Sequence, residues 1–208
     1  MNSLDVDIII RSNKLCFREI YTPRFINNIY YDTINFKHYL MGVNGDCKRT
    51  KIRFRWYGEL KNNVNNGLFE VKHKIGSLGY KDRYDIKHTI KKSNNILNSL
   101  LNCEFNDLAD ITFKSVSPLK SVLINRYHRK YYESPDHKIR ITLDSDLTFY
   151  SIYSSVLNKI NYVMPNHSIM EVKYDQGYDS LAFNFICEMP FRLSKCSKYE
   201  LGLRNIYG

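Results

Sequence analysis

The sequence predicts a mainly β protein (α+β), in which an antiparallel sheet, closed or strongly curved, carries a few helices packed on its outside. Eight segments alternate polar and apolar residues with a period of two, which is typical of strands that bury one face. Several loops between these segments suit hairpins, and helical spacing is confined to short stretches. We expect strands at residues 27–33, 49–57, 68–75, 80–86, 121–133, 137–150, 168–175 and about 193–201.

The segment 49–57 has the clearest alternation. Its odd positions from 49 to 55 are all basic, and its even positions are mostly apolar. Because successive side chains of a strand point to opposite faces, one face of this strand is basic and the other suits a core. The polar segment 61–67 that follows predicts a hairpin loop, since its Asn and Gly residues tolerate positive φ angles.

Two short stretches predict helices. Apolar residues recur at helical spacing over 96–101, after Ser93 or Asn94, either of which suits an N-cap. A second helix is expected over about 179–187, with a capping residue at its first or second position. These helices would pack on the outside of the sheet.

The separation of charged and apolar residues recurs in six of the strands. If the apolar faces pack under helices, the charged faces line either open solvent or an enclosed lumen, and a closed eight-stranded barrel would make that lumen a tunnel. An empty basic lumen is unfavourable because its cations repel one another, so bound anions or interleaved carboxylates are needed. Arginine grips phosphate oxygens bidentately, and carboxylates can hold a divalent metal. The carboxylates on these faces are Glu70, Asp85, Asp144 and Glu171.

Size and composition limit the remaining possibilities. A length of 208 residues predicts a single domain over residues 1–208. The 31 Lys and Arg against 21 Asp and Glu leave a net charge of +10, which favours nucleic acid, phosphate-rich molecules or anionic lipid as partners. No apolar run is long enough for a membrane span, and the acidic start does not suit a signal peptide, so we expect a cytoplasmic protein. The five scattered cysteines predict neither disulfides nor a zinc site.

Six segments carry a resemblance when they are taken in order. They read NNIYYDT (27–33), KIRFRWYG (51–58), FEVKHK (69–74), IRITLD (139–144), MEVK (170–173) and SKY (197–199). The ordered set resembles the VTC domain, the polyphosphate polymerase domain of the vacuolar transporter chaperone complex and its bacterial relatives. That family belongs to the triphosphate tunnel metalloenzymes, a CYTH-like superfamily.

The resemblance implies an eight-stranded antiparallel β-barrel tunnel that transfers the γ-phosphoryl group of ATP to a polyphosphate chain, with Mn²⁺ or Mg²⁺ as cofactor. The catalytic positions that it implies are Arg53, Arg55, Lys72, Arg126, Arg140 and Lys198. The basic residues expected to bind the substrate are Lys51, Lys74, Lys81, Lys138 and Lys173. The acids expected to bind the metal are Glu171 and Glu70.

The start of the chain departs from the family pattern. Family members usually begin with a strand of the type R-Y-E-R-K, whose acid and lysine point into the tunnel. Here residues 6–10 resemble the helix that normally follows that strand, so we expect the first tunnel strand to be missing, either because the sequence starts late or because the strand has been lost. A barrel without one wall has an unpaired edge and an open lumen.

Two alternative functions stay open beside polyphosphate synthesis. One is a non-catalytic module that binds polyphosphate or inositol phosphate, and the other is a triphosphatase. Nucleic acid is not expected, because the aromatic residues of the basic strands mostly lie opposite the charges, where bases could not stack beside the cations. The expected partners are ATP and polyphosphate or other phosphate-rich anions, and the sequence identifies no membrane-associated partner protein.

Overall fold

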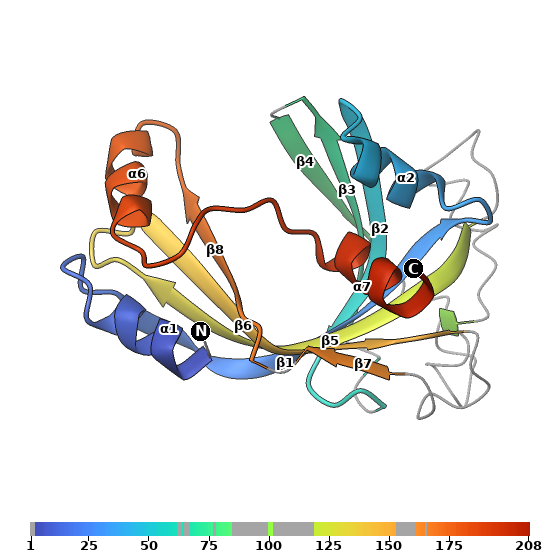
Figure 1. Ribbon diagram of the computed structural model, residues 1–208, viewed down its shortest axis with the longest axis horizontal. Helices are drawn as coiled ribbons and strands as arrows, with labels where there is room; N and C mark the ends of the chain where they lie inside the picture. The colour runs from blue at the N-terminus through green and yellow to red at the C-terminus, as the bar shows by residue number, and fades with distance from the viewer. Residues whose placement is uncertain are drawn as a thin grey trace. The chain divides into compact units, whose positions relative to one another are not determined.

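A computed structural model describes residues 3–61, 64, 67–76, 78–84, 100–101, 119–152, 161–164 and 166–208 (Figure 1). In chain order its helices and strands are α1 (Ser3–Arg11), β1 (Arg18–Thr33), α2 (Lys37–Asn44), β2 (Lys48–Tyr57), β3 (Leu68–Ile75), β4 (Leu78–Tyr84), β5 (Leu119–Glu133), β6 (Ile139–Tyr150), β7 (Asn161–Met164), β8 (Ile169–Tyr174), α6 (Asp179–Cys187) and α7 (Lys198–Tyr207). None of the described helices is long and apolar enough to cross a membrane.

The strands pair in the order β4-β3-β2-β1-β5-β6-β7, and β8 pairs with β6. The pairs β1–β2, β2–β3, β3–β4 and β6–β8 are antiparallel. The expected mainly antiparallel sheet with a few helices is therefore confirmed. The closed barrel is not confirmed, because among the described strands no pairing joins β4 to β7 or β8, and the sheet is open.

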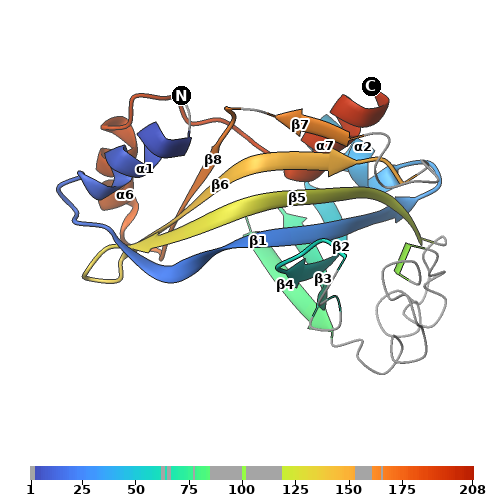
Figure 2. The same cartoon turned by 90° about the horizontal axis from the view of Figure 1, so that it is seen from below.

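The chain divides into two compact units. Unit 1 comprises residues 1–25, 127–148 and 163–196, and unit 2 comprises residues 26–126, 149–162 and 197–208. The four strands β1, β5, β6 and β7 contribute residues to both units (Figure 2). The expectation of one domain over residues 1–208 stays a prediction.

The core of unit 1 forms where α1 and α6 cover the apolar face of β6 and β8 (Figure 1). Ile139, Ile141 and Leu143 alternate with polar residues along β6 and are at most 2% exposed. They belong to one cluster with Ile10 of α1 and Phe185 of α6. The helix expected over about 179–187 is confirmed as α6, and residues 6–10 are helical within α1.

The core of unit 2 forms on the apolar face of β2. Ile52, Phe54 and Trp56 are at most 1% exposed and pack against Tyr31 of β1 and Phe69 of β3. Because these residues occupy the even positions of β2, its basic odd positions lie on the opposite face. The alternation that predicts this strand thus sets which face carries the charge.

One expected strand is wrong. Residues 198–207 form helix α7, where a strand was expected over about 193–201. The hydroxyl of Ser197 accepts a hydrogen bond from the backbone N–H of Glu200 (3.3 Å), which is half of a Ser-x-x-Glu capping box. The sequence analysis also missed α2 and β7, and β1 begins at Arg18 rather than at residue 27. Most of the expected loop 61–67 and helix 96–101 lie outside the described residues.

Asp32, at the end of β1 in unit 2, joins three elements. Its carboxylate accepts hydrogen bonds from the backbone N–H groups of His38 and Tyr39 (both 2.9 Å) at the start of α2. The hydroxyl of Tyr199 in α7 donates to the same carboxylate. Burial, and then the charge of Asp32, raise the pKa of Tyr199 well above its ordinary value. This fully buried carboxylate holds α2 and α7 on β1 through charge-assisted hydrogen bonds.

The substitution Tyr199→Phe removes one donor to the buried carboxylate. We expect the free energy of unfolding to fall by about 1–3 kcal/mol, the cost of leaving a buried polar group under-satisfied. Urea denaturation followed by circular dichroism measures the change. Tyr80→Phe is the control, because Tyr80 is 53% exposed and such changes stay within about 0.5 kcal/mol. Equal effects of the two substitutions would contradict the anchoring role of Asp32.

Candidate functional site

Basic side chains gather on one face of β2, β3 and β4 in unit 2. The pairing register places Lys51, Lys72 and Lys81 side by side across the three strands. The next row of the same face begins at Arg53, continues through the acid of β3 and ends on β4. We call this surface the basic face, and it consists of Arg49, Lys51, Arg53, Arg55, Glu70, Lys72, Lys74, Lys81 and Arg83.

Glu70 is the one acid of the basic face, and it lies at its centre. Its side chain is 4% exposed. Its Oε2 accepts a hydrogen bond from Nε of Arg53 (2.8 Å), and its Oε1 contacts Nζ of Lys81. Nε of Arg55 lies 3.9 Å from Oε2, and Nε of Arg83 lies 3.6 Å from Oε1. One buried carboxylate therefore faces four cations.

The pKa values of Glu70 and Lys81 are both lowered in this environment. Burial opposes ionisation of Glu70, but the positive charges of Arg53 and Arg55 and the hydrogen bond from Lys81 outweigh it and lower the pKa of Glu70 to about 2. Burial also disfavours the charged form of Lys81, and the attraction of Glu70 offsets it in part, so the pKa of Lys81 falls to about 8. Glu70 is thus ionised at neutral pH, and Lys81 loses its proton only slightly above neutral pH.

Two further residues of the basic face are held by neighbouring elements of unit 2. Nε of Arg55 donates a hydrogen bond to the side-chain oxygen of Asn28 on β1 (2.8 Å). Nζ of Lys51 donates to Ser197 (2.6 Å) and to Glu200 of α7 (2.9 Å). α7 is therefore tied to the basic face at its first turn, where Lys198 is the first helical residue.

The expected residues of β6 and β8 share a separate face in unit 1. The register pairs Arg140 with Lys173 and Thr142 with Glu171, opposite the apolar face that α1 and α6 cover. These side chains are exposed, at 53% for Arg140, 53% for Lys173 and 46% for Glu171. Nζ of Lys173 lies 3.6 Å from Oε1 of Glu171. Lys138 contacts Asp136 at 3.1 Å.

Arg126 lies away from the basic face, although the resemblance implies it as a partner of Arg53. Asn125 makes a hydrogen bond to β1 on the side of the basic face (2.7 Å), whereas Ile124 packs into the core of unit 2 on the opposite side. Because side chains alternate along β5, Arg126 shares the side of Ile124. Its Nη2 lies 3.5 Å from a carboxylate oxygen of Glu59.

Arg129 is a residue that the sequence analysis missed. It lies in unit 1, where Nε and Nη2 contact the two carboxylate oxygens of Asp144 at 2.5 and 2.7 Å. The pair is buried, with Arg129 at 9% and Asp144 at 1% exposure. Burial disfavours the charge on Arg129, but the hydrogen bonds to Asp144 outweigh it and raise the pKa of Arg129 above its ordinary value. The fork-to-carboxylate geometry fixes the Arg129 guanidinium.

The structure therefore groups the expected residues by unit. Unit 2 brings together Lys51, Arg53, Arg55, Glu70, Lys72, Lys74 and Lys81, with Lys198 on the adjoining helix. Unit 1 contains Lys138, Arg140, Glu171 and Lys173. A lumen shared by both groups stays a prediction.

The donor set around Glu70 does not suit a divalent metal. Both carboxylate oxygens already contact cations, and four positive charges would repel a further one. The arrangement favours charge balancing as the role of Glu70. Glu171 fits the role of a single carboxylate ligand, since its side chain is about half exposed and Mg²⁺-type sites often use one or two carboxylates with substrate phosphates. Within the described ranges, no group of three His, Cys, Asp or Glu residues is placed to hold a metal.

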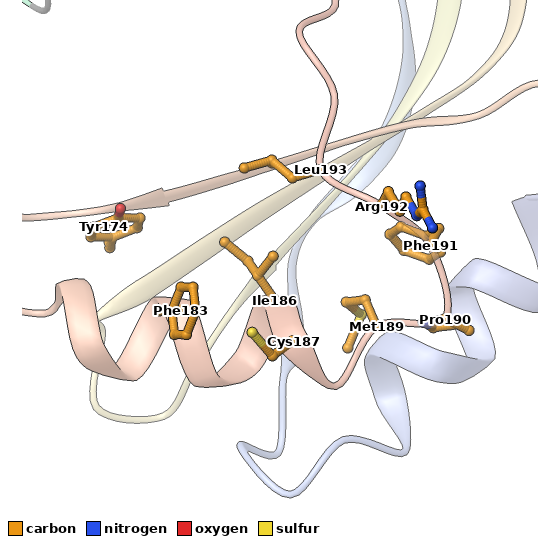
Figure 3. Close-up of a pocket in the computed structure, with 9 residues that line it drawn as sticks. All are labelled: Tyr174, Phe183, Ile186, Cys187, Met189, Pro190, Phe191, Arg192 and Leu193. Atoms are coloured by element: carbon orange, nitrogen blue, oxygen red, sulfur yellow. The ribbon is translucent and has the colours of Figure 1, made fainter.

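A pocket of about 550 Å³ in unit 1 has a different character (Figure 3). It lies between α6 and the segment that follows it, and apolar side chains such as Phe183, Ile186 and Leu193 line it. Arg192 is the basic residue at its edge. None of the side chains expected at the functional site lines this pocket, so it does not extend the basic face.

The depressed pKa of Glu70 predicts a pH-dependent contribution to stability. A carboxylate with a folded-state pKa near 2 stabilises the protein fully above its unfolded value of 4.5 and loses that contribution as the pH falls toward 2. We expect Glu70→Gln to lower the free energy of unfolding by about 3 kcal/mol at pH 7, and the difference from the parent to vanish near pH 2. Urea denaturation from pH 7 to pH 2 measures it. The control is Glu59→Gln, since Glu59 is 67% exposed; a pH-independent effect of Glu70→Gln would contradict the ion-pair role.

Comparison with known proteins identifies the family of this chain. The model of the VTC domain family matches residues 4–207. No curated protein matches the chain at a significant level. The family is associated with polyphosphate polymerase activity and hence with phosphate-rich ligands. Since the match covers nearly every residue, the chain belongs to the VTC domain family.

Proposed function

We propose that the protein binds the triphosphate of ATP and a polyphosphate chain on the basic face, and that it transfers the γ-phosphoryl group from ATP to that chain. The observation that carries this proposal is the set of cations packed around the buried Glu70. Such a surface is repulsive without a bound anion and becomes favourable with one. Membership of the VTC domain family supports the same ligand class.

The spacing of the basic face suits a linear polyanion. Neighbouring strands lie about 4.8 Å apart, so a row of paired residues presents cations at that interval. The row Lys51, Lys72 and Lys81 can therefore contact successive phosphate groups of one chain. Arg53 and Arg55 in the adjacent rows offer planar guanidinium groups, which suit the paired oxygens of a phosphate.

Phosphoryl transfer needs little covalent chemistry from the protein, because positioning and charge neutralisation lower the barrier. Arg53 and Arg55 would hold the oxygens of the transferred group, and Lys72 and Lys81 would hold the phosphates beside it. Glu70 would keep these cations in place rather than touch the substrate. Lys198, on the helix that adjoins the basic face, would contribute further positive charge.

A divalent metal, Mn²⁺ or Mg²⁺, would neutralise charge on the phosphates when it is bound, and Glu171 would be its protein ligand. Glu171 is assigned this role because it is half exposed and has one cation near its carboxylate, unlike Glu70. The metal-independent part of the proposal, anion binding on the basic face, rests on unit 2 alone.

The direct test incubates the purified protein with ATP and Mn²⁺ and resolves polyphosphate on a gel. We expect chain growth, and a loss of about 10²–10³-fold in rate for Arg53→Ala, the scale of removing one preorganised electrostatic group. Arg204→Ala is the control, since Arg204 is an exposed cation near the end of α7. Thermal stabilisation by tripolyphosphate without chain growth would replace synthesis by a binding function, and release of orthophosphate alone would indicate a triphosphatase. No stabilisation by tripolyphosphate would overturn the anion site itself.

The lowered pKa of Lys81 makes a second prediction. With a pKa near 8 the free protein carries a partly neutral Lys81 at pH 8.5, whereas a bound polyanion favours the charged form and raises its pKa. Binding of tripolyphosphate at about pH 8.5 should therefore take up a fraction of a proton. Isothermal titration in two buffers of different ionisation enthalpy measures the uptake. Lys81→Arg should bind with less uptake, because arginine stays charged, and an unchanged uptake would show that Lys81 does not contact the anion.

A further inference from the structure

Three polar side chains form a hydrogen-bonded line that runs from the basic face of unit 2 across the neighbouring strands. Nε of Arg55 on β2 donates to Oδ1 of Asn28 on β1 (2.8 Å), and Nδ2 of Asn28 donates to Oδ1 of Asn125 on β5 (2.7 Å). The three strands are neighbours in the sheet, and β1 and β5 run side by side in Figure 2. Asn28 is 0% and Asn125 is 1% exposed.

The direction of this line is fixed by chemistry. A guanidinium group cannot accept a hydrogen bond, so the amide of Asn28 must turn its oxygen toward Arg55. The NH₂ group of Asn28 then faces Asn125, whose side-chain oxygen accepts the hydrogen bond. A reversed Asn28 would place donors against Arg55 and lose the bond to the guanidinium. Arg55 therefore sets the orientation of Asn28, and Asn125 supports that orientation by accepting a hydrogen bond from its NH₂ group.

The two asparagines of this line are not the residues that would stabilise the fold most. Nδ2 of Asn125 is buried and has no hydrogen-bond partner among the described residues. A buried donor left unsatisfied costs about 1–3 kcal/mol. Apolar residues at both Asn positions would avoid that cost, and β-branched residues suit strand interiors better than Asn. What the two asparagines provide in return is a fixed orientation of Arg55.

We infer that Asn28 is a positioning residue for the bound phosphate chain, which it serves by orienting the guanidinium of Arg55, and that Asn125 supports Asn28 by accepting a hydrogen bond from its NH₂ group. This inference rests on the proposed function. Because Asn28 holds Nε from the side of β1, and Glu70 lies 3.9 Å away, the plane of the Arg55 guanidinium is set before the anion arrives. Preorganisation of this kind lowers the entropy lost on binding.

Asn27 provides a matched control. It is also 0% exposed, and its Nδ2 donates one hydrogen bond to the backbone oxygen of Gly58 (3.0 Å). The register pairs Asn27 with Trp56, on the core side of β1, and Asn28 with Arg55, on the side of the basic face. Asn27→Ala and Asn28→Ala thus remove neighbouring buried amides from opposite faces of the same strand.

The experiment measures the Kd of tripolyphosphate by isothermal titration without metal, with the thermal midpoint as a separate readout of stability. We expect both Ala variants to lower the midpoint. Asn28→Ala should weaken binding about tenfold, and Asn27→Ala should stay within about twofold of the parent. In an Arg55→Ala background, Asn28→Ala should weaken binding no further, because it acts through that arginine.

The possible results distinguish failure of the positioning role from failure of the proposed function. Equal effects of Asn27→Ala and Asn28→Ala on Kd, or additive effects of Asn28→Ala and Arg55→Ala, would overturn the positioning role while leaving the anion site in place. Absence of tripolyphosphate binding by the parent would overturn the proposed function and this inference together. If Asn28→Ala does not fold, Asn125→Ala replaces it. Since that change removes only the second link, we expect about threefold weaker binding in the parent background and no further weakening with Arg55→Ala; a Kd equal to that of Asn27→Ala would overturn the inference.

Discussion

Repulsion among like charges is the constraint on which the rest of unit 2 depends. Two unit charges about 4 Å apart interact by roughly 1 kcal/mol in water and several times more near a protein surface. The basic face carries several such pairs across β2, β3 and β4, and the buried Glu70 is the group that offsets them. Because Glu70 lies at the centre, its single carboxylate offsets the repulsion among four cations. The protein can therefore fold without a bound anion although the basic face stays strongly positive.

The packing of the aromatic core determines which face of the sheet carries those cations. Phe54 and Trp56 are fully buried on one side of β2, and a slip of one residue would exchange them with the neighbouring arginines, Arg53 and Arg55. The register of β1, β2 and β3 is therefore specified by packing on the side that carries no charge. The same logic holds in unit 1, where Ile139 and Ile141 under α1 and α6 determine that Arg140 is exposed.

The sequence predicted most of the strands and the basic face because a period of two is a strong local signal when one face is apolar. It failed where that signal is weak. Residues 122–124 are all apolar, so alternation does not show which side of β5 faces the core, and it gives Arg129 no signature as a buried arginine. Ser197 and Glu200 have the spacing of a capping box, but short alternation favoured a strand.

The buried asparagines were beyond the reach of pattern analysis for a different reason. Asn is depleted in strands, so Asn28 within 27–33 contributes nothing to the alternation and has no local signature of its role. Its partner Asn125 is distant in sequence and meets it only because β1 and β5 are neighbours in the sheet.

The attachment of α7 has a consequence for the order in which the chain can fold during synthesis. Asp32 accepts hydrogen bonds from N–H groups of α2 that lie only six and seven residues after it in the sequence. The strands β2, β3 and β4 also pair through short connections. These parts can therefore form early. Tyr199 and Glu200 follow more than 140 residues after the partners that they bind, Asp32 and Lys51. On the ribosome, Asp32 and Lys51 therefore gain these contacts only after α7 has emerged, and a chain released before α7 would keep both residues without the contacts that hold them.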